Sequence, residues 1–540
     1  MSRIFDHLEQ HAQSQGDRPA LWAKRFDGSY DSVTWSQLAE RARRFAAACA
    51  SWVDEGRVLP LLLGKTPACV AAMLGTLGAR RAFACLFHKL RPPQIERIIV
   101  DTQTPVVVVD AQGIMAIKDG LTAGSPISRT RWIVVRGADF GPLQQRLLTQ
   151  LRTVAAVEEW DEAAPAPALP AADIPSTLPG CCLFTSGSTG VPKGVLIGHN
   201  DLYDRAAAEV EWYGLKPTDV LLNILPFSFD VGLNQLLSAV HVGCELVLLD
   251  SWFPRDIMKA VKTRQVTGIS SVPSIWLDFM AKGQQFETAG AHRSLRYLTV
   301  SGGDMSKLHL DLLPGIAPGV QIFKTYGQTE AFRATSLKPP EFAARPTSVG
   351  RPFAGVQLYI VRPDGTRADP GEQGEVVHSG LGVMLGYLGG QDPQNKLRPN
   401  PFQGDADKAA HAVFTGDLGH LDAEGYLFLA GRRDDMVKIT GNRVYPLEVR
   451  DQLLTVEGVL LAEVVPVKTA DQTRLAAFVI LRPEAKLEPA AIQAHLAARV
   501  PSYMVPEKIV LKSEFPRTAS GKPDRPALAA EALPLFAPAT

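Results

Sequence analysis

Thr185-Ser186-Gly187-Ser188-Thr189-Gly190-Val191-Pro192-Lys193-Gly194 is the most informative stretch of this 540-residue sequence. It directly follows the apolar run Cys181-Cys182-Leu183-Phe184, which we expect to form a buried strand. Its glycines allow tight turns and expose backbone amides, and hydroxyl groups and one ammonium surround them. Such a loop suits a polyphosphate, because oxyanions favour many short donors and little steric bulk. The P-loop spacing is absent, and Ser186 stands where a nucleophile elbow needs its first glycine.

The segments around this loop indicate an α/β fold. Val106–Val109 and Trp132–Val135 are short apolar runs that predict buried strands. Thr34-Trp35-Ser36-Gln37 is a capping-box pattern, in which the Thr and Gln side chains satisfy free amides at a helix start. Strands that alternate with helices favour a largely parallel sheet covered on both faces. The Ala- and Pro-rich segment from Ala163 to Leu178 predicts a loop or linker.

After Gly350 the pattern changes to short alternating strands separated by turns. Val356–Val361, Glu375–His378 and Tyr426–Leu429 are the strands that we expect here. Turn dipeptides such as Asp364-Gly365 separate them. This part of the sequence therefore predicts a small antiparallel or barrel-like unit.

The C-terminal part of the chain has a self-contained α+β pattern. Helices are expected at Leu447–Leu454 and Ala490–Val500, and strands at Ala462–Val467 and Leu475–Leu481. We place the boundary that precedes this unit near Gly431–Asp435. Its length, roughly 110 residues, is near the lower end of usual domain sizes.

The composition excludes several classes of protein. Fifty-six Lys and Arg residues balance 56 Asp and Glu residues, which argues against a broadly basic surface for nucleic acid. Six cysteines without a C-x-x-C pair fit a reducing compartment. The first 20 residues are polar and charged, unlike a secretory signal. The apolar run Val70–Ala79 is about half the length of a membrane-spanning helix. We therefore expect a cytoplasmic protein with no membrane span and no nucleic-acid partner.

Further motifs follow the glycine-rich loop in a defined order. They are Tyr326-Gly327-Gln328-Thr329-Glu330, Thr415-Gly416-Asp417-Leu418-Gly419, Gly431-Arg432-Arg433-Asp434-Asp435-Met436-Val437-Lys438 with Ile439-Thr440-Gly441, and Pro516-Arg517-Thr518-Ala519-Ser520-Gly521-Lys522. Together with the loop they resemble the signatures of the adenylate-forming (AMP-binding) superfamily. That superfamily contains acyl-CoA synthetases, the adenylation domains of peptide synthetases, and luciferases. The resemblance spans nearly the whole chain.

The resemblance implies a fold with two unequal parts. Residues 1–433 would form a large composite N-terminal domain, with two α/β subdomains and the small β-barrel-like part. Residues 434–540 would form a small, mobile α+β domain that carries the catalytic lysine. Asp434 occupies the hinge position of the family, and a thiol channel would lie near Gly441. Rotation at Asp434 would replace Lys522 with that channel after adenylation.

The resemblance also implies a reaction and its site residues. The family joins a carboxylate to AMP from ATP, releases pyrophosphate, and usually passes the acyl group to a thiol. Glu330 would hold Mg²⁺, Thr329 would contact the α-phosphate, and Lys522 would bridge the α-phosphate and the substrate carboxylate. Asp417 would accept both ribose hydroxyls, with Arg432 beside it. The β- and γ-phosphates would be bound by the loop residues Thr185, Ser186, Gly187, Ser188, Thr189, Gly190 and Lys193. Gly302 and Gly303 would line the adenine and acyl sites, and Tyr326 and Gly327 would also contact the nucleotide.

The acyl pocket leaves alternatives open. Asp230 lies where amino-acid-activating members place an Asp that pairs with the substrate ammonium, but capping of the helix from Val231 is about equally favoured. For Arg333 we favour a surface ion pair slightly over a contact with an acidic substrate group. The remaining pocket positions implied by the resemblance are Asn234, Ser270, Thr299, Ser301, Thr325 and Ala334. This lining is more polar than a long-chain fatty acid would prefer.

Two functions therefore compete. The leading interpretation is a stand-alone acyl-CoA ligase that uses ATP, Mg²⁺ and a small carboxylic acid. The alternative is a ligase that activates an amino acid and loads the phosphopantetheine of a separate carrier protein, since we find no fused carrier domain. A non-catalytic nucleotide-binding protein is less favoured, because Lys522, Glu330 and Asp417 are all present.

Overall fold

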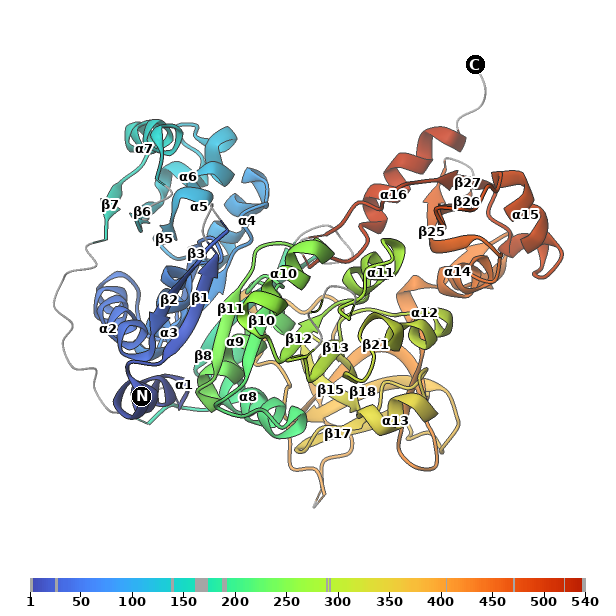
Figure 1. Cartoon of the computed structure of the whole chain (residues 1–540), viewed down its shortest axis with the longest axis horizontal. Coiled ribbons are helices and arrows are strands. Elements are labelled where there is room, and N and C mark those ends of the chain that lie inside the picture. Colours follow the sequence, from blue (N-terminus) through green and yellow to red (C-terminus); the bar gives the residue numbers. More distant parts are fainter. Residues whose placement is uncertain are drawn as a thin grey trace.

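The computed structural model describes residues 3–24, 28–136, 140–160, 173–186, 192–287, 290, 293–404, 406–469, 472–518 and 520–536. It confirms the mixed α/β fold, with a large N-terminal part and a smaller C-terminal part (Figure 1). The expected loop between Ala163 and Leu178 has no helix or strand in its described portion, residues 173–178. Within the described ranges, no helix combines the length and the apolar composition that a membrane crossing requires.

The first sheet contains the strands on both sides of the glycine-rich loop. Its order is β19-β9-β8-β4-β3-β5-β6-β7. The strands from β4 to β7 are parallel, whereas β8 and β9 form the antiparallel pair that the loop connects. The strands are β3 (Val58–Leu62), β4 (Ala82–Cys85), β5 (Val106–Val109), β6 (Arg131–Val134), β7 (Val157–Glu159), β8 (Pro179–Ser186), β9 (Pro192–Gly198) and β19 (Gly386–Tyr387). The helices between them are α3 (Pro67–Gly78), α4 (Pro92–Thr102), α5 (Ala111–Ile117), α6 (Pro126–Arg129) and α7 (Pro142–Val154).

The second sheet has nine strands in the order β16-β15-β14-β13-β12-β10-β11-β1-β2. Its strands are β1 (Pro19–Lys24), β2 (Tyr30–Thr34), β10 (Val220–Asn223), β11 (Glu245–Leu248), β12 (Gly268–Ser271), β13 (Tyr297–Val300), β14 (Gln321–Gln328), β15 (Ala331–Leu337) and β16 (Arg351–Pro352). Its helices are α1 (Arg3–Gln15), α2 (Trp35–Trp52), α8 (His199–Tyr213), α9 (Asp230–Val242), α10 (Pro254–Arg264), α11 (Pro273–Ala281), α12 (Lys307–Leu312) and α13 (Pro339–Ala344). Apolar side chains of both sheets share one core, including Leu61 and Phe83 from the first and Leu221 and Leu246 from the second.

Local sequence signals explain several of these boundaries. Helix α2 begins at the predicted capping box, because Thr34 Oγ1 accepts from Gln37 N at 3.3 Å and Gln37 Oε1 accepts from Thr34 N at 3.0 Å. The predicted strand at Val106–Val109 is confirmed, and the other is shifted by one residue to Arg131–Val134.

A five-stranded antiparallel sheet confirms the change of pattern after Gly350. Its path is β17-β18-β21-β20, with β22 paired to β21. The strand expected at Tyr426–Leu429 extends further, to Arg432. The strands are β17 (Val356–Val361), β18 (Gly374–Gly380), β20 (Leu397–Pro399), β21 (His411–Leu421) and β22 (Leu427–Arg432).

The C-terminal part packs a three-stranded sheet with helices. A single helical turn, η4 (Arg433–Asp435), precedes it, at the expected boundary; the division at residue 434 stays a prediction. The predicted helix at Ala490–Val500 ends earlier, at Ala497, since Pro501 disfavours helical backbone at the residue before it. The elements are β23 (Val437–Ile439), β24 (Asn442–Val444), α14 (Pro446–Leu453), β25 (Val459–Lys468), β26 (Thr473–Leu481), α15 (Pro489–Ala497), β27 (Lys508–Leu511) and α16 (Arg525–Ala532).

Candidate active site

A cavity of about 330 Å³ lies where the three sheets and the C-terminal part converge. The antiparallel pair β14–β15 carries Thr329 and Glu330 on its turn, so both residues project beyond the sheet edge into the cavity. Many of the predicted site residues line this cavity: Thr185, Lys193, Asp230, Gly302, Thr325, Gly327, Thr329, Glu330, Arg333, Arg432, Asp434 and Lys522. The structure therefore brings together motifs that are hundreds of residues apart in the chain.

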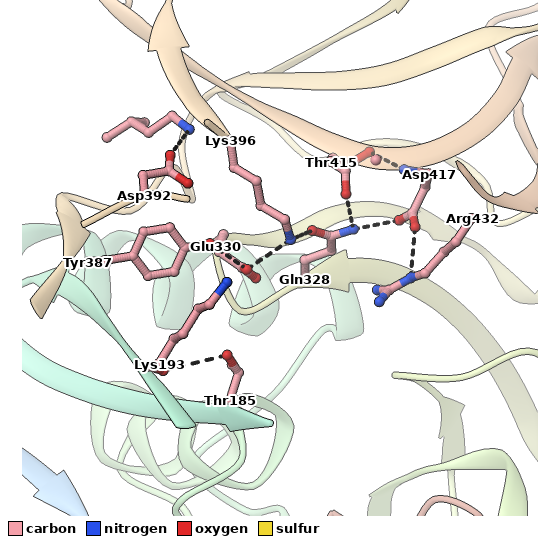
Figure 2. A network of polar contacts seen from close by, with 12 residues as sticks. Thr185, Lys193, Gln328, Glu330, Tyr387, Asp392, Lys396, Thr415, Asp417 and Arg432 are labelled. Atoms are coloured by element: carbon pink, nitrogen blue, oxygen red, sulfur yellow. Dashed lines mark hydrogen bonds and ion pairs between the residues drawn. The ribbon is translucent and has the colours of Figure 1, made fainter. Parts of the chain in front are cut away.

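An organised carboxylate, Asp417 on β21, lies beside one end of the cavity, where it contacts the lining residues Gln328 and Arg432. Its Oδ2 accepts hydrogen bonds from Tyr326 Oη at 2.6 Å and from Gln328 Nε2 at 2.7 Å. Its Oδ1 lies 3.0 Å from Arg432 Nε (Figure 2). Burial, with the nearby Asp417 charge, raises the pKa of Tyr326 well above its usual value, so Tyr326 remains a donor. Asp417 is therefore held in one orientation by neutral and cationic donors.

A second carboxylate, Glu330, lies at the turn between β14 and β15. Its Oε1 accepts from Lys396 Nζ at 2.9 Å and from Tyr387 Oη at 2.8 Å. Lys396 Nζ also donates to Gln328 Oε1 at 3.2 Å, which joins the two carboxylate clusters into one network (Figure 2). Burial alone would raise the pKa of Glu330, but the charge and hydrogen bond of Lys396 hold it below its usual value. Glu330 is thus kept ionised.

The donor set around Glu330 fits a magnesium ion that is bound largely by phosphate oxygens. Among the described residues, both side-chain partners contact Oε1, so Oε2 has no such partner there. Within the described ranges, no group of three or more His, Cys, Asp or Glu side chains is arranged to hold a metal. Mg²⁺ in phosphate-transfer sites commonly uses one or two carboxylates together with substrate phosphates and water. A single ionised carboxylate is consistent with that kind of site.

The glycine-rich loop connects β8 and β9 beside this network. Thr185 and Lys193 are register partners at the ends of the two strands, and both line the cavity. Thr185 Oγ1 donates to Lys193 O at 3.5 Å, and the Lys193 side chain extends from β9 toward Glu330 (Figure 2). Gly187, Ser188, Thr189 and Gly190 lie outside the described residues, as does the Ser186 side chain.

The other end of the cavity contains Lys522, which comes from the C-terminal part of the chain. Its Nζ lies 5.4 Å from the centre of the Phe229 ring. Gly302 has a φ of +72°, and a Cβ there would lie 2.9 Å from Phe229 Cζ and 3.7 Å from Lys522 Cε. A side chain at Gly302 would therefore displace the Phe229 ring. Burial lowers the pKa of Lys522, and the Asp230 carboxylate opposes this effect.

Asp230 is the first residue of α9 and faces the same cavity. The helix starts one residue earlier than expected, so Phe229 and not Asp230 is the cap residue. The Asp230 Oδ1 still accepts from Val231 N at 2.7 Å, a free amide of the first turn. Burial raises the pKa of Asp230, although the positive charges of Arg333 and Lys522 oppose this. The helix-start role and a position in the cavity are thus both observed, and they do not exclude each other.

The expectation of a surface ion pair at Arg333 is wrong. Arg333 is only 7% exposed, and its Nε lies 2.5 Å from Oε1 of the buried Glu209 on α8. Its Nη1 donates to Ser301 Oγ at 2.9 Å and Thr325 Oγ1 at 2.6 Å. Burial alone would lower the pKa of Arg333, but Glu209 raises it. Glu209 on α8 and the Ser301 and Thr325 hydroxyl groups surround the guanidinium, and the residues next to Arg333 in the sequence do not reveal these partners.

Several predicted positions lie outside the cavity lining. Thr299 and Ser301 belong to a chain of hydroxyl groups that contacts Arg333. Thr299 Oγ1 lies 3.4 Å from Ser301 Oγ, which lies 2.5 Å from Thr325 Oγ1. Gly441 is exposed at the turn between β23 and β24, so its role in a thiol channel stays a prediction. The other predicted positions outside the lining are Asn234, Ser270, Ala334, Gly303, Tyr326 and Asp417, and the last two contact the cavity network as described above.

The sequence missed Lys396, Tyr387 and Glu209. Lys396 and Tyr387 come from the segment between Gly386 and Pro399, which contains none of the family's sequence motifs named above. Glu209 is one of several polar residues on α8, and only its contact across to β15 distinguishes it. Helix α8 also buries His199 and Arg205, so no local pattern in the sequence distinguishes Glu209.

Comparisons with known proteins agree with this geometry. A family model described as AMP-binding enzyme matches residues 8–388, and one described as AMP-binding enzyme C-terminal domain matches residues 448–522. The chain is 28% identical to the L-proline--[L-prolyl-carrier protein] ligase of Pseudomonas fluorescens, over 92% of this chain and 94% of that protein. It is 31% identical to bacitracin synthase 3 of Bacillus licheniformis over 64% of this chain, but spans only 5% of that much longer protein. ATP-bound MatB from Rhodopseudomonas palustris shares the fold, with a TM-score of 0.76, 21% identity, and coverage of 99% of this chain and 100% of that chain.

Proposed function

Because this chain belongs to the AMP-binding enzymes and is an adenylate-forming ligase, we propose that it activates a small amino acid as its acyl-adenylate. Pyrophosphate leaves in this step, and the acyl group then passes to a phosphopantetheine thiol. The observation that carries the proposal is the presence of Asp230 and Lys522 in one cavity, where Lys522 lies close to Phe229 and Gly302. A carboxylate and an ammonium placed together match the two charged groups of an amino acid.

The nucleotide would occupy the end of the cavity that contains the carboxylate network. Asp417 offers two oriented oxygens to the ribose hydroxyls, with Arg432 beside it. Thr185, Lys193 and Lys396 would lie along the phosphates. Mg²⁺ at Glu330 would neutralise phosphate charge. Apart from that of Lys396, which rests on its position in the cavity, these assignments come from the resemblance of the motifs and are supported by the positions of the side chains.

In the first step the substrate carboxylate oxygen attacks the α-phosphorus, and the bond from that phosphorus to the oxygen of the leaving pyrophosphate breaks. Lys522 would hold the carboxylate against the α-phosphate and stabilise the charge that develops there. In the second step the thiol sulfur attacks the acyl carbonyl, its proton is lost, and AMP leaves. Both steps rely mainly on positioning and charge stabilisation rather than on a protein nucleophile.

The substrate class follows from the walls of the acyl end. Asp230 is buried with one backbone donor, Val231 N, on its Oδ1, and a buried carboxylate is costly unless it is fully paired. A substrate ammonium would supply a further partner. Arg333 Nη2 is buried without a hydrogen-bond partner among the described residues, so an acceptor on a compact side chain would satisfy it. A long alkyl chain would instead meet the charged Arg333–Glu209 pair.

A second candidate is a dicarboxylic acid that is converted to its CoA ester. The buried Arg333 guanidinium favours it, because the second carboxylate could receive the free Nη2. In that case Asp230 would act only at the start of α9. The thiol acceptor is the same chemical group in CoA and in a carrier protein, so the two sources must be compared directly.

The deciding experiment is ATP–pyrophosphate exchange with small polar amino acids, apolar amino acids, dicarboxylic acids and fatty acids. We expect exchange with small polar amino acids, and its loss in Asp230→Asn with the fold intact. Exchange with dicarboxylic acids at the same rate in the wild type and in Asp230→Asn would establish the second candidate instead. Absence of exchange with every acid would refute the proposal. Radiolabelled acid, offered to CoA and to phosphopantetheinylated carrier protein in parallel, then identifies the acceptor.

A further inference from the structure

The segment that carries Lys522 is a small hairpin with its own internal bonds. Arg517 pairs with Pro523 as an isolated bridge, Thr518 N donates to Lys522 O at 2.8 Å, and Gly521 N donates to Thr518 O at 3.0 Å. Asp524 N closes the base by donating to Pro516 O at 2.7 Å. These bonds fix the shape of the hairpin, but they do not by themselves fix where it lies relative to the cavity.

Two side chains of helix α11 hold the hairpin from outside. Ser274 Oγ donates to Gly521 O at 2.5 Å, and Arg517 Nη2 donates to Asp278 Oδ1 at 2.6 Å. Ser274 and Asp278 are four residues apart, so they lie on one face of α11. The two contacts reach the residue before Lys522 and the residue that begins the hairpin strand. They thus restrain the lysine from both sides.

The approach of the hairpin to α11 is close and largely shielded from solvent. Gly521 has a φ of +83°, and a Cβ there would lie 3.4 Å from Val272 Cγ2, just before the helix. The Arg517 and Asp278 side chains are 24% and 21% exposed. Burial raises the pKa of Asp278, while Arg517 and Lys282 oppose this and Glu514 adds to it. An ion pair in such a place is stronger than an exposed one, because solvent screens it less.

We propose that Ser274 and Asp278 are positioning residues for adenylation, which seat the hairpin so that Lys522 reaches the cavity. The inference rests on the proposed role of Lys522. When the thiol enters for the second step, both contacts are released together with the lysine. The contacts between helix α11 and the hairpin are therefore present during adenylation and absent during thioester formation.

Two further contacts between the two parts of the chain do not involve the hairpin. Arg450 Nη2 lies 2.5 Å from Asp304 Oδ2, and His309 Nε2 lies 2.8 Å from Leu460 O. Helix α14 and strand β25 supply these contacts near α12 (Figure 1). They attach the body of the C-terminal part, whereas Ser274 and Asp278 act on the segment that carries the lysine.

The test compares Asp278→Asn, Ser274→Ala and the double variant with Asp311→Asn as a matched control. Asp311 lies on α12, pairs with Lys307 at 2.7 Å within the large part of the chain, and is about half exposed. ATP–pyrophosphate exchange with the most active acid of the panel reports the first step. Thioester formation from supplied acyl-adenylate reports the second. Hydrogen–deuterium exchange of the peptide containing Thr518 and Gly521 reports the seating of the hairpin without any ligand.

We expect Asp278→Asn to lower kcat for exchange roughly 10- to 100-fold, because a small misplacement of a positioned group has that effect. The KM for ATP, the second step and the control should be unchanged, and deuterium uptake in the hairpin should rise. The charge exchange Asp278→Arg with Arg517→Asp should recover part of the loss. The inference would be overturned if Asp278→Asn and Ser274→Ala kept the wild-type kcat. It would also be overturned if the rates of both steps fell equally and the Tm was lower. Absence of exchange in the wild type would refute the proposed function, and deuterium uptake would still decide whether α11 seats the hairpin.

Discussion

The two ends of the cavity are built differently. At the nucleotide end, Asp417 and Glu330 are held by donors from the large part of the chain, and a single network through Gln328 and Lys396 connects them. At the acyl end, Lys522 arrives from the C-terminal part and depends on contacts across the two parts. The first end is preorganised, whereas the second is assembled by docking. Nucleotide binding should therefore tolerate disturbance of the docking contacts, and adenylation should not.

The largest effect is expected at the docked end, from Lys522→Ala. Adenylation should fall about 10⁴-fold, because the variant removes the group that would stabilise the phosphoryl-transfer charge. Binding of ATP, measured by calorimetry, should change little, because Asp417 and Glu330 keep their partners. Thioester formation from supplied acyl-adenylate should survive. An unchanged exchange rate would remove Lys522 from the chemistry.

Removing one partner of the buried Arg333–Glu209 pair should lower the free energy of unfolding and not only the rate of adenylation. Glu209→Ala leaves the Arg333 guanidinium buried without its ionic partner, since both side chains are at most 7% exposed. Removing one partner of a buried ion pair typically destabilises by about 3–5 kcal/mol. Chemical denaturation should show this fall in the free energy of unfolding. The double variant Glu209→Leu with Arg333→Met should recover much of it, and a single variant as stable as wild type would contradict the buried-pair description.

At the preorganised end, Asp417→Asn should weaken ATP binding. The substitution keeps the shape of the side chain but removes the charge that Arg432 contacts and one of the two acceptor oxygens. Loss of charge-assisted hydrogen bonds of this kind corresponds to a roughly 100-fold rise in the KM for ATP. The kcat should fall much less. A fall in kcat at unchanged KM would place Asp417 with the reacting atoms instead of the ribose.

The difference between the two ends also explains what the sequence could predict. The nucleotide end is built from contiguous motifs, so Thr329, Glu330, Asp417 and Arg432 could be proposed as site residues without coordinates, and their roles stay predictions. Lys396 and Glu209 contribute through single contacts with segments far away in the chain, and no local pattern distinguishes them from surface residues. The prediction for Arg333 failed for the same reason, because its buried partner Glu209 lies on α8 and not among its neighbours in the sequence.

The smallest effect is expected on the pH dependence of the adenylation rate. It distinguishes docking of the C-terminal part, which involves His309, from ATP binding at the nucleotide end. Burial lowers the pKa of His309 to about 4, and its neutral ring bridges Ser306 and Leu460 O between the two parts. Since the histidine binds protons more readily when released, the docked state loses stability as the pH falls from 6.5 toward 4, by roughly 2 kcal/mol at pH 5. His309→Gln keeps a donor for Leu460 O but does not titrate, so its adenylation rate should decline less on acidification than that of the wild type. ATP affinity should fall in parallel in the two proteins over the same range. Identical rate profiles would show that His309 does not control docking.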